Sequence, residues 1–394
     1  MSPFKNAAHV FIASAARTPV GSFRGSLAKA TTPALGTVAA RAAIDRSGLS
    51  PKDIEEVFMG NVLSAGLGQA PARQVALGAG CPDTTEATTI NKVCASGMKA
   101  ITLATQSLQL GVREIMLAGG MESMSNVPFY APRGAIYGHQ SLQDGIVHDG
   151  LWDVYNQVAM GVCAEDTASK YGITREQQDA HAIASYQRAA AAWKAGKFQN
   201  EIVAVPLKGR GGKTSMVEVD EEYTKVTLEK IPNLRPVFVP EGGTVTAANS
   251  STLSDGASAV VLASDKAIQD HKLNPLAQVI AYADAAGPPM NFPTAPADAI
   301  RNALSIAGLS KEKIDLWEIN EAFSVVIRAN EQLLDLDPAK VNVAGGGVAL
   351  GHPIGSSGSR IVVTLTHLLK PGQYGCAAVC NGGGASTAII IKRV

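Results

Sequence analysis

The segment RAAIDRSGLS at residues 41–50 recurs as RNALSIAGLS at residues 301–310, a shift of 260 residues. Each copy runs on into a short apolar stretch, at residues 57–59 and at residues 316–319. The apolar spacing followed by a glycine predicts a helix, a turn and then a strand in both places. Two matching segments so far apart indicate that the chain contains two similar α/β units.

Two further matches follow in the same order. ASGMK at residues 95–99 corresponds to SSGSR at residues 356–360, and Gly119-Gly120 corresponds to Gly382-Gly383. We therefore expect each half to run as helix, strand, Gly-rich loop, helix, strand and Gly-Gly pair. Two copies of a long unit indicate a duplication rather than a solenoid, which needs more copies of a shorter unit.

The residues between the two units have no counterpart and a different composition. A helix is expected over residues 175–193, opened by Thr174, and a charged, Gly-rich segment follows at residues 208–230. We interpret this stretch as a long insertion over one domain, suited to binding a substrate. The predicted domains are residues 1–122 completed by about 252–272, a loop domain at 123–251, and residues 273–394.

Composition excludes several classes of protein. The chain has 394 residues, 46% hydrophobic and 17% charged, with 34 basic and 34 acidic side chains. A basic footprint for nucleic acid is absent, and no apolar run is long enough to span a membrane. Five scattered cysteines without zinc-type spacing predict a reducing compartment and no structural disulfides. The first strand is expected near residue 9, so we expect no targeting peptide before it.

Cys94 is the first candidate catalytic residue. It lies between a strand expected at residues 88–93 and a helix expected at residues 98–110. The free N–H groups and the positive dipole end of that helix are expected to favour the thiolate, which is the nucleophilic form. A lone cysteine is more often a core residue. Further segments favour the nucleophile.

Three of these segments carry Asn320, His352 and Cys380. Asn320 follows the strand at residues 316–319, where open α/β folds place ligand groups, although a lone asparagine is more often a helix cap. His352 lies between Gly-rich and Pro-Ile-Gly turns, after an expected strand at 340–344 and before a helix from about 359, which suits proton transfer.

Cys380 precedes three glycines, after an expected strand at residues 376–379. Successive glycines free backbone N–H groups to form an oxyanion hole or a phosphate nest. No GxGxxG opens a helix there, so a dinucleotide fingerprint is excluded. The duplication symmetry predicts that Cys94 of one half lies near His352 and Cys380 of the other.

Eight short stretches together resemble the thiolase family, nearly from end to end. They are ARTP at 16–19, GNV at 60–62, QAPARQ at 69–74, NKVCASG at 91–97, GGMESM at 119–124, NEAF at 320–323, GHP at 351–353 and CNGG at 380–383. The resemblance implies an α/β thiolase fold, with two duplicated βαβαβαββ domains in a five-layer αβαβα arrangement and an inserted loop domain. It also implies a homotetramer built from tight dimers.

The resemblance implies an acetyl-CoA C-acetyltransferase, because CASGMK at residues 94–99 is similar to the acetoacetyl-CoA branch of the family. In that reading, Cys94 carries the acetyl group after His352 takes its proton. Cys380 then removes a proton from a second acetyl-CoA. His352 and a water on Asn320 stabilise the enolate, and the N–H groups of Cys94 and Gly382 form the oxyanion hole.

Ligand contacts are also implied by the resemblance alone. CoA, acetyl-CoA and acetoacetyl-CoA are the expected partners, with no covalently bound cofactor. The expected CoA contacts are Tyr186, Lys225, Val226, Thr227 and Lys230 near the nucleotide and Ser251 near the pantetheine. Many family members carry a histidine where this chain has Ala159, so one pantetheine contact is expected to be missing.

Asp284-Ala285-Ala286 and Asn291-Phe292-Pro293 resemble the potassium-activated mitochondrial acetoacetyl-CoA thiolases. The implied K⁺ ligands, mostly carbonyl oxygens, are Tyr186, Ala247, Ala248, Ser250 and Val348. Ser250 replaces the usual alanine there, a change that keeps the carbonyl. The same resemblance places the protein in the mitochondrial matrix, with the cytoplasm as the alternative.

Several alternatives remain open at this point. A broad-range 3-oxoacyl-CoA thiolase of fatty acid degradation differs from the first reading in its chain-length profile. A ketoacyl synthase is disfavoured because decarboxylating members use Cys-His-His or Cys-His-Asn sets. A non-catalytic acyl-CoA or lipid binder on the same fold has no need for Cys94, His352 and Cys380 together. A Cys-His hydrolase is disfavoured by the paired domains and the second cysteine.

Overall fold

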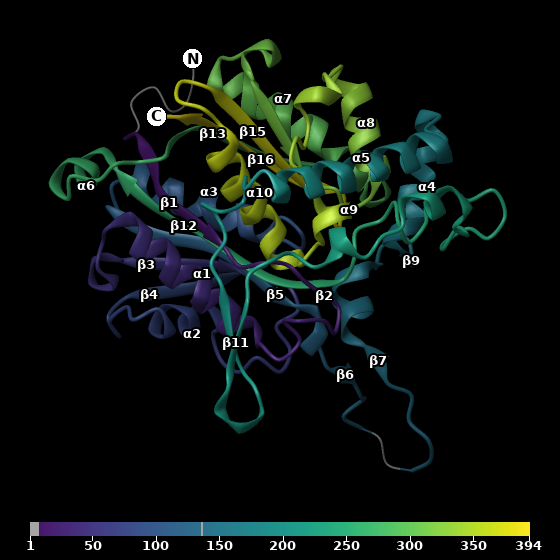
Figure 1. The fold of residues 1–394 in the computed structure, drawn as a ribbon, viewed down its shortest axis with the longest axis horizontal. Helices are drawn as coiled ribbons and strands as arrows, with labels where there is room; N and C mark the ends of the chain where they lie inside the picture. Colours follow the sequence, from purple (N-terminus) through teal and green to yellow (C-terminus); the bar gives the residue numbers. More distant parts are fainter. Residues whose placement is uncertain (1–7, 135–136) are drawn as a thin grey trace.

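The computed structural model describes residues 8–134 and 137–394, in which helices and sheets alternate in five layers (Figure 1). The strands of both halves join in one sheet, in the order β14-β15-β16-β13-β1-β12-β5-β3-β4 with β2 on β12. The two halves meet where β1 pairs antiparallel with β13. The strands are β1 (Val10–Arg17), β2 (Gly21–Ser22), β3 (Glu56–Gly60), β4 (Glu86–Ile90), β5 (Ile115–Ser123), β12 (Ser254–Ser264), β13 (Ala277–Ala286), β14 (Leu316–Ile319), β15 (Tyr374–Asn381) and β16 (Ala385–Arg393).

Helices occupy the two outer layers and the central one. The outer helices are α1 (Thr32–Ser47) and α2 (Pro71–Gly78) on one side and α7 (Ala295–Ala307) and α8 (Ser324–Leu334) on the other; the central pair is α3 (Ser96–Gln109) and α10 (Ile354–Leu368). Strand β5 shows how two of the cores lie on its opposite faces. Ile115 and Leu117 pack in the outer core, whereas Met116 and Ala118 pack in the central one. Successive side chains point to opposite faces of a strand, so both faces of the sheet are buried at β5.

The repeated segments fold alike, as predicted. Helix α1 ends at Gly48 with φ 80°, and α7 ends at Gly308 with φ 65°, a left-handed cap that glycine adopts without strain. A short 3₁₀ turn then leads into β3 or β14. The matched segments 95–99 and 356–360 begin the two central helices, which pack against each other.

The third predicted match is wrong in its register. Gly119 and Gly120 lie inside β5, whereas Gly382 and Gly383 follow the end of β15. The reason for the glycine inside β5 is the close approach of α10, because a Cβ on Gly120 would lie 2.1 Å from the Gly355 carbonyl oxygen. The first Gly-Gly pair therefore lies in a strand that α10 approaches closely, whereas the second lies in the turn after β15.

Two further expectations need correction. The strand expected at residues 340–344 is absent, and only an isolated bridge joins Val341 to Trp317. The chain turns instead at Asn342, whose φ is 46° and whose side chain bonds both the N–H and the carbonyl of Ile319. Helix α10 begins at Ile354 rather than near residue 359, so its first turn follows His352 directly.

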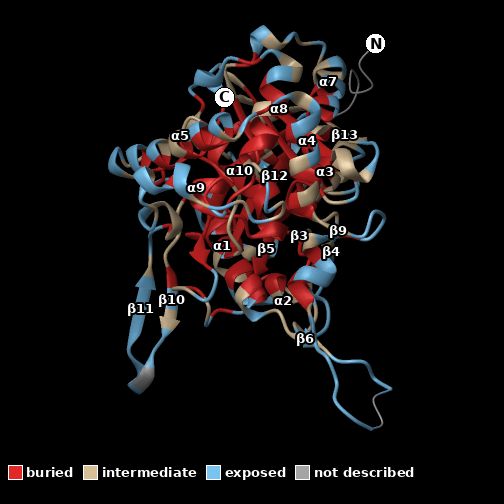
Figure 2. Cartoon of the chain, turned by 90° about the vertical axis from the view of Figure 1, so that its right-hand side faces the viewer, coloured by how far each residue is buried: buried red, intermediate tan, exposed pale blue. Residues whose placement is uncertain are grey.

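The inserted residues that the structure describes include two α-helices and three β-hairpins. Helix α4 (Met160–Tyr171) precedes α5 (Arg175–Lys194), and Thr174 caps α5 together with Gln177 as predicted. The hairpins are β6 (Phe129–Tyr130) with β7 (Gln143–Asp144), β8 (Trp152–Asp153) with β9 (Val158–Ala159), and β10 (Val205–Lys208) with β11 (Thr214–Val217). Hairpins β6–β7 and β10–β11 project from the body and are largely exposed (Figure 2). In the described part of the chain, no helix is long and apolar enough to cross a membrane.

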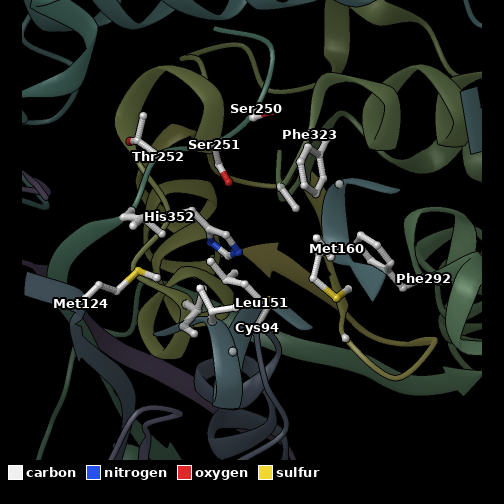
Figure 3. Close-up of a pocket in the computed structure, with 18 of the residues that line it drawn as sticks. Cys94, Met124, Leu151, Met160, Ser250, Ser251, Thr252, Phe292, Phe323 and His352 are labelled. Atoms are coloured by element: carbon white, nitrogen blue, oxygen red, sulfur yellow. The ribbon is translucent and has the colours of Figure 1, made fainter. Parts of the chain in front are cut away.

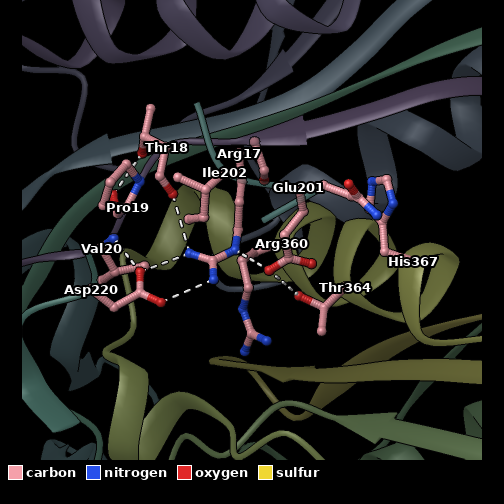
Figure 4. A network of polar contacts seen from close by, with 12 residues as sticks. Arg17, Thr18, Pro19, Val20, Glu201, Ile202, Asp220, Arg360, Thr364 and His367 are labelled. Carbon is pink, nitrogen blue, oxygen red and sulfur yellow. Dashed lines mark hydrogen bonds and ion pairs between the residues drawn. The ribbon is translucent and has the colours of Figure 1, made fainter. Parts of the chain in front are cut away.

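A buried ionic network joins β1 to the inserted residues (Figure 4). The Arg17 guanidinium donates to Glu201 at 2.5 Å and to both carboxylate oxygens of Asp220 at 2.7 and 2.9 Å. All three side chains are buried, and Asp220 also accepts a hydrogen bond from Trp193 Nε1 at 3.0 Å. Because a buried charge needs a well-oriented partner, this network fixes where the insertion lies on the core.

Candidate active site

A cavity of about 360 Å³ lies where the two halves meet the insertion (Figure 3). Three of the predicted catalytic residues, Cys94, His352 and Gly382, line it. The rest of the wall is mostly apolar, and it includes Met124, Val147, Leu151, Met160, Phe238, Phe292, Phe323 and Ile354. An apolar cavity with a few convergent polar groups is typical of a site that binds and transforms a small molecule.

Cys94 is presented by a strained turn between β4 and α3. The preceding residue, Val93, has φ 46°, which is rare for a β-branched residue. Two side chains hold the turn: Asn91 Oδ1 accepts from the Val93 N–H at 3.0 Å, and Ser96 Oγ donates to the Val93 carbonyl at 2.5 Å. Strain of this kind persists only where the surroundings impose it, and it gathers at functional sites.

The backbone N–H groups at the helix end favour a Cys94 thiolate, as predicted, but burial outweighs their effect in the resting site. Burial raises the pKa of the Cys94 thiol to about 12, although the backbone N–H groups of Gly382 and of Cys94 itself act the other way. The charge of Glu122 raises it further. The resting residue is therefore a thiol, and it needs a base before it can attack.

His352 is a neutral base. Burial, aided by the positive charge of Arg360, lowers its pKa to about 3. Its Nδ1 lies 2.5 Å from Ser357 Oγ, while its buried Nε2 has no hydrogen-bond partner among the described residues. The imidazole points into the cavity, on the side where Cys94 lies (Figure 3). A neutral imidazole with one free nitrogen can accept a proton from the thiol.

Cys380 and Asn320 do not line the cavity themselves, although Gly382 and Ala322, each two residues further along the chain, do. Cys380 is fully buried and packs in the same core cluster as Met160 and Phe292, which line the cavity. Burial raises the pKa of its thiol, and the proximity of Cys94 adds to that effect. Asn320 is also fully buried, and its side-chain oxygen and nitrogen have no hydrogen-bond partner among the described residues. Such a buried amide is suited to hold water.

The buried carboxylate of Glu321, a residue of the NEAF motif for which no role was predicted, supports these residues. Glu321 accepts hydrogen bonds from Ser185 at 2.7 Å, Asn342 at 2.9 Å and the Val348 N–H at 3.1 Å. Although burial opposes it, His181 and these donors lower the pKa of Glu321 to about 2. The carboxylate therefore stays charged and ties the segment after Asn320 to the loop that carries His352.

The residues expected to contact CoA or K⁺ fall into three groups. Ser250 and Ser251 line the cavity, whereas Tyr186, Ala248 and Val348 share a buried cluster, with Val226 packed against it. Ala247, Thr227 and Lys230 are exposed. The exposed Lys225 pairs with Glu221 at 3.3 Å and Glu222 at 3.9 Å. In the described residues, no group of three or more His, Cys, Asp or Glu side chains could hold a metal ion.

Comparison with known sequences identifies the family. Residues 10–266 match the family description "Thiolase, N-terminal domain", and residues 273–393 match "Thiolase, C-terminal domain". The chain belongs to the thiolase family. This thiolase is 56% identical over 386 residues to the mitochondrial acetyl-CoA acetyltransferase of Rattus norvegicus, covering 98% of this chain and 91% of that protein. It is also 56% identical to a probable acetyl-CoA acetyltransferase of Dictyostelium discoideum, over 99% of this chain and 95% of that protein.

Solved structures agree with the predicted thiolase fold. The Acat5 thiolase of Ascaris suum, solved in complex with coenzyme A, is 50% identical with a TM-score of 0.94, covering 98% of this chain and all of that one. The acetyl-CoA acetyltransferase of Bacillus anthracis is 39% identical with a TM-score of 0.95, covering 99% of this chain and 100% of that one. Both the fold and the family that the eight motifs predicted are confirmed.

Proposed function

We propose that this thiolase is an acetyl-CoA C-acetyltransferase that condenses two acetyl-CoA molecules reversibly into acetoacetyl-CoA and CoA. The sequence comparison supports this activity, because more than half of the residues are identical to those of acetyl-CoA acetyltransferases over nearly the whole chain. The single structural observation that carries it is a buried, neutral His352 on the same cavity as the Cys94 thiol. This pair supplies a nucleophile and its base, as acyl transfer requires.

The first half-reaction acetylates Cys94. His352 accepts the thiol proton on its free nitrogen, and the thiolate attacks the carbonyl of acetyl-CoA. The backbone N–H groups of Cys94 and Gly382, which already act on the resting sulfur, stabilise the oxyanion of the tetrahedral intermediate. The carbon–sulfur bond to CoA breaks, and the Cys380 thiol gives its proton to the departing CoA thiolate. Cys380 is then a thiolate, and His352 keeps the proton from Cys94 on Nε2.

The second half-reaction forms the carbon–carbon bond. The Cys380 thiolate removes a proton from the methyl group of a second acetyl-CoA, and the Nε2–H of His352 with a water on Asn320 stabilises the enolate. The enolate attacks the acetyl carbonyl on Cys94, and the Cys94 thiolate leaves and regains its proton from His352. A thioester suits both halves, because it is an activated acyl donor and its α-protons are more acidic than those of an ester.

CoA enters beside the loop domain, residues 123–251, with the pantetheine at Ser251 and the nucleotide near Lys225 and Lys230. The position of Ser251 on the cavity wall supports the pantetheine end. Tyr186, Val226 and Thr227 complete the proposed nucleotide contacts. Small Ala159 on the same wall leaves the pantetheine without the histidine contact of other family members.

A potassium ion is proposed as an activator, held mainly by carbonyl oxygens of Ala247, Ala248, Ser250 and Val348 and by the Tyr186 hydroxyl. The common cluster of Tyr186, Ala248 and Val348 supports it. Oxygen ligands suit a hard cation of this kind. When bound, the ion would stiffen the segment that leads to Ser251.

A homotetramer in the mitochondrial matrix is proposed as the setting of this reaction, with the cytoplasm as the alternative. Apolar side chains on the projecting hairpin, such as Phe129 at 63% and Leu142 at 61% exposure, support assembly. The names of the mitochondrial relatives support the compartment. Light scattering of the purified chain and imaging of the tagged full-length chain in cells test these two proposals.

Thiolysis of acetoacetyl-CoA by free CoA tests the proposed activity. The assay runs beside a medium-chain 3-oxoacyl-CoA, first in K⁺ and then in Na⁺ buffer, with Cys94→Ala as the inactive control. We expect fast turnover of acetoacetyl-CoA alone, higher activity in K⁺, and none with the variant. Comparable turnover of both substrates would indicate a broad-range thiolase. Normal turnover by Cys94→Ala would contradict the assigned nucleophile, and equal rates in both salts would contradict the ion site.

A further inference from the structure

Ser357 contacts His352 on the side away from the cavity. It lies in the first turn of α10, five residues after His352, and is buried. Its Oγ lies 2.5 Å from His352 Nδ1 and 3.0 Å from the backbone carbonyl oxygen of Pro353. The hydroxyl therefore has two neighbours, and the chemistry of each limits how its single proton can be used.

The carbonyl oxygen of Pro353 can only accept a hydrogen bond, so the Ser357 hydroxyl must donate its proton there if that contact is to form. The Ser357 oxygen then accepts from His352, which requires the proton of the neutral imidazole on Nδ1. This arrangement satisfies both contacts at once. In the reverse tautomer Nδ1 could only accept, so the single Ser357 proton would face two acceptors, and one of the two contacts would be left with two opposed lone pairs.

The other ring nitrogen supports the same assignment. Nε2 is buried and has no hydrogen-bond partner among the described residues. An N–H group there would be a buried donor without an acceptor, facing a mostly apolar wall, which is unfavourable. A bare lone pair at Nε2 is the form that can take the thiol proton.

We propose that Ser357 is a positioning residue, which fixes His352 in the tautomer with its proton on Nδ1 and so presents the Nε2 lone pair to Cys94. This inference deepens the proposed acyl-transfer function and rests on it. In the reaction, the Cys94 S–H bond breaks, its electron pair stays on sulfur, and the proton binds Nε2. The imidazolium that forms keeps its Nδ1–H bond to Ser357, whose oxygen stabilises the new positive charge.

Ser357→Ala tests the proposal, with Ser359→Ala as the matched control. Ser359 is a buried serine on the same helix, but its hydroxyl bonds Ser258 and the Ser356 carbonyl and does not touch His352. We expect Ser357→Ala to lower kcat about 10- to 100-fold with little change in KM, because the neutral ring loses its preferred tautomer. Ser357→Thr keeps the hydroxyl and is expected to recover most of the activity. Equal kcat for the two alanine variants would overturn the proposal.

A second readout does not depend on activity. The chain has seven histidines, so the ¹⁵N NMR signals of His352 must first be assigned in the intact, ¹⁵N-histidine-labelled protein. They are the signals that disappear from the spectrum of the His352→Asn variant. We expect an unprotonated Nε2 in the wild type and a mixture of tautomers in Ser357→Ala. A protonated Nε2 in the wild type would refute the assigned tautomer. Absence of thiolysis by the wild type with the expected tautomer would refute the proposed function alone.

Discussion

Glu122 accepts a hydrogen bond from the backbone N–H of Gly355 at 3.1 Å, although the two residues lie 233 positions apart. Glu122 is the last residue but one of β5 in the first half of the chain, and Gly355 is the second residue of α10 in the second half. The same carboxylate also accepts from the N–H groups of Val62 and Leu63 and from the Asn61 side chain. One buried side chain thus joins both halves directly beneath the turn that carries His352.

Glu122→Ala is expected to destabilise the protein, because it leaves three buried backbone N–H groups without an acceptor. Each orphaned donor costs about 1–3 kcal/mol, so a combined loss of several kcal/mol is expected. Thermal unfolding of the variant measures it, with the exposed Glu241→Ala as control. An unfolding temperature equal to that of the control would show that Glu122 does not hold the two halves together.

The pH dependence of Cys94 alkylation follows from its environment. Burial raises the pKa of this thiol to about 12, so the reactive thiolate is a small fraction at neutral pH. Because pH stays below that pKa throughout, the fraction rises about tenfold with each pH unit. We therefore expect the rate of iodoacetamide modification of the Cys94 peptide to climb from pH 7 to pH 9.5 without a plateau. A plateau near neutral pH would instead reveal a resting thiolate–imidazolium pair.

The sequence could predict the layers because they depend on local patterns. Helix, glycine cap and strand recur around Gly48 and Gly308, and the structure shows both caps. The positions of Cys94, His352 and Gly382 were also predictable, since each follows a recognisable strand end or Gly-rich turn. All three line one cavity.

The rest depends on tertiary contacts that a local pattern does not contain. The effect of the helix end on Cys94 was predicted, but burial outweighs it. Ser357 lies in the matched segment SSGSR at residues 356–360, yet only the fold brings its hydroxyl to His352. Val93 reads as an ordinary strand residue, and its positive φ results from the Asn91 and Ser96 side chains that hold the turn.

Removing the positive charge of Arg17 is expected to weaken the attachment of the inserted residues to the core. Arg17→Met leaves the buried carboxylates of Glu201 and Asp220 without their cation, and breaking such a pair typically costs about 3–5 kcal/mol. We expect a lower unfolding temperature and faster proteolysis within the insertion. Arg301→Met, which breaks an exposed pair with Asp298, is the control and is expected to change little. Equal protease resistance of the two variants would argue against an anchoring role for Arg17.

Asn320→Ala separates the two half-reactions. The Asn320 side chain is buried beside the site, and neither of its polar atoms has a hydrogen-bond partner among the described residues. The substitution therefore removes the proposed water position without breaking another hydrogen bond. In the proposed mechanism, acetylation of Cys94 does not use that water, whereas enolate formation does.

We therefore expect the acetyl-enzyme to form from acetyl-CoA at nearly the wild-type rate. Condensation is expected to slow by about 10²-fold, which corresponds to a loss of ~2.7 kcal/mol of transition-state stabilisation. Rapid-quench measurement of acetyl-Cys94 alongside steady-state condensation distinguishes the steps, and Asn302→Ala on the surface of α7 serves as the control. Equal slowing of both steps would mean that Asn320 shapes the cavity as a whole rather than stabilising the enolate.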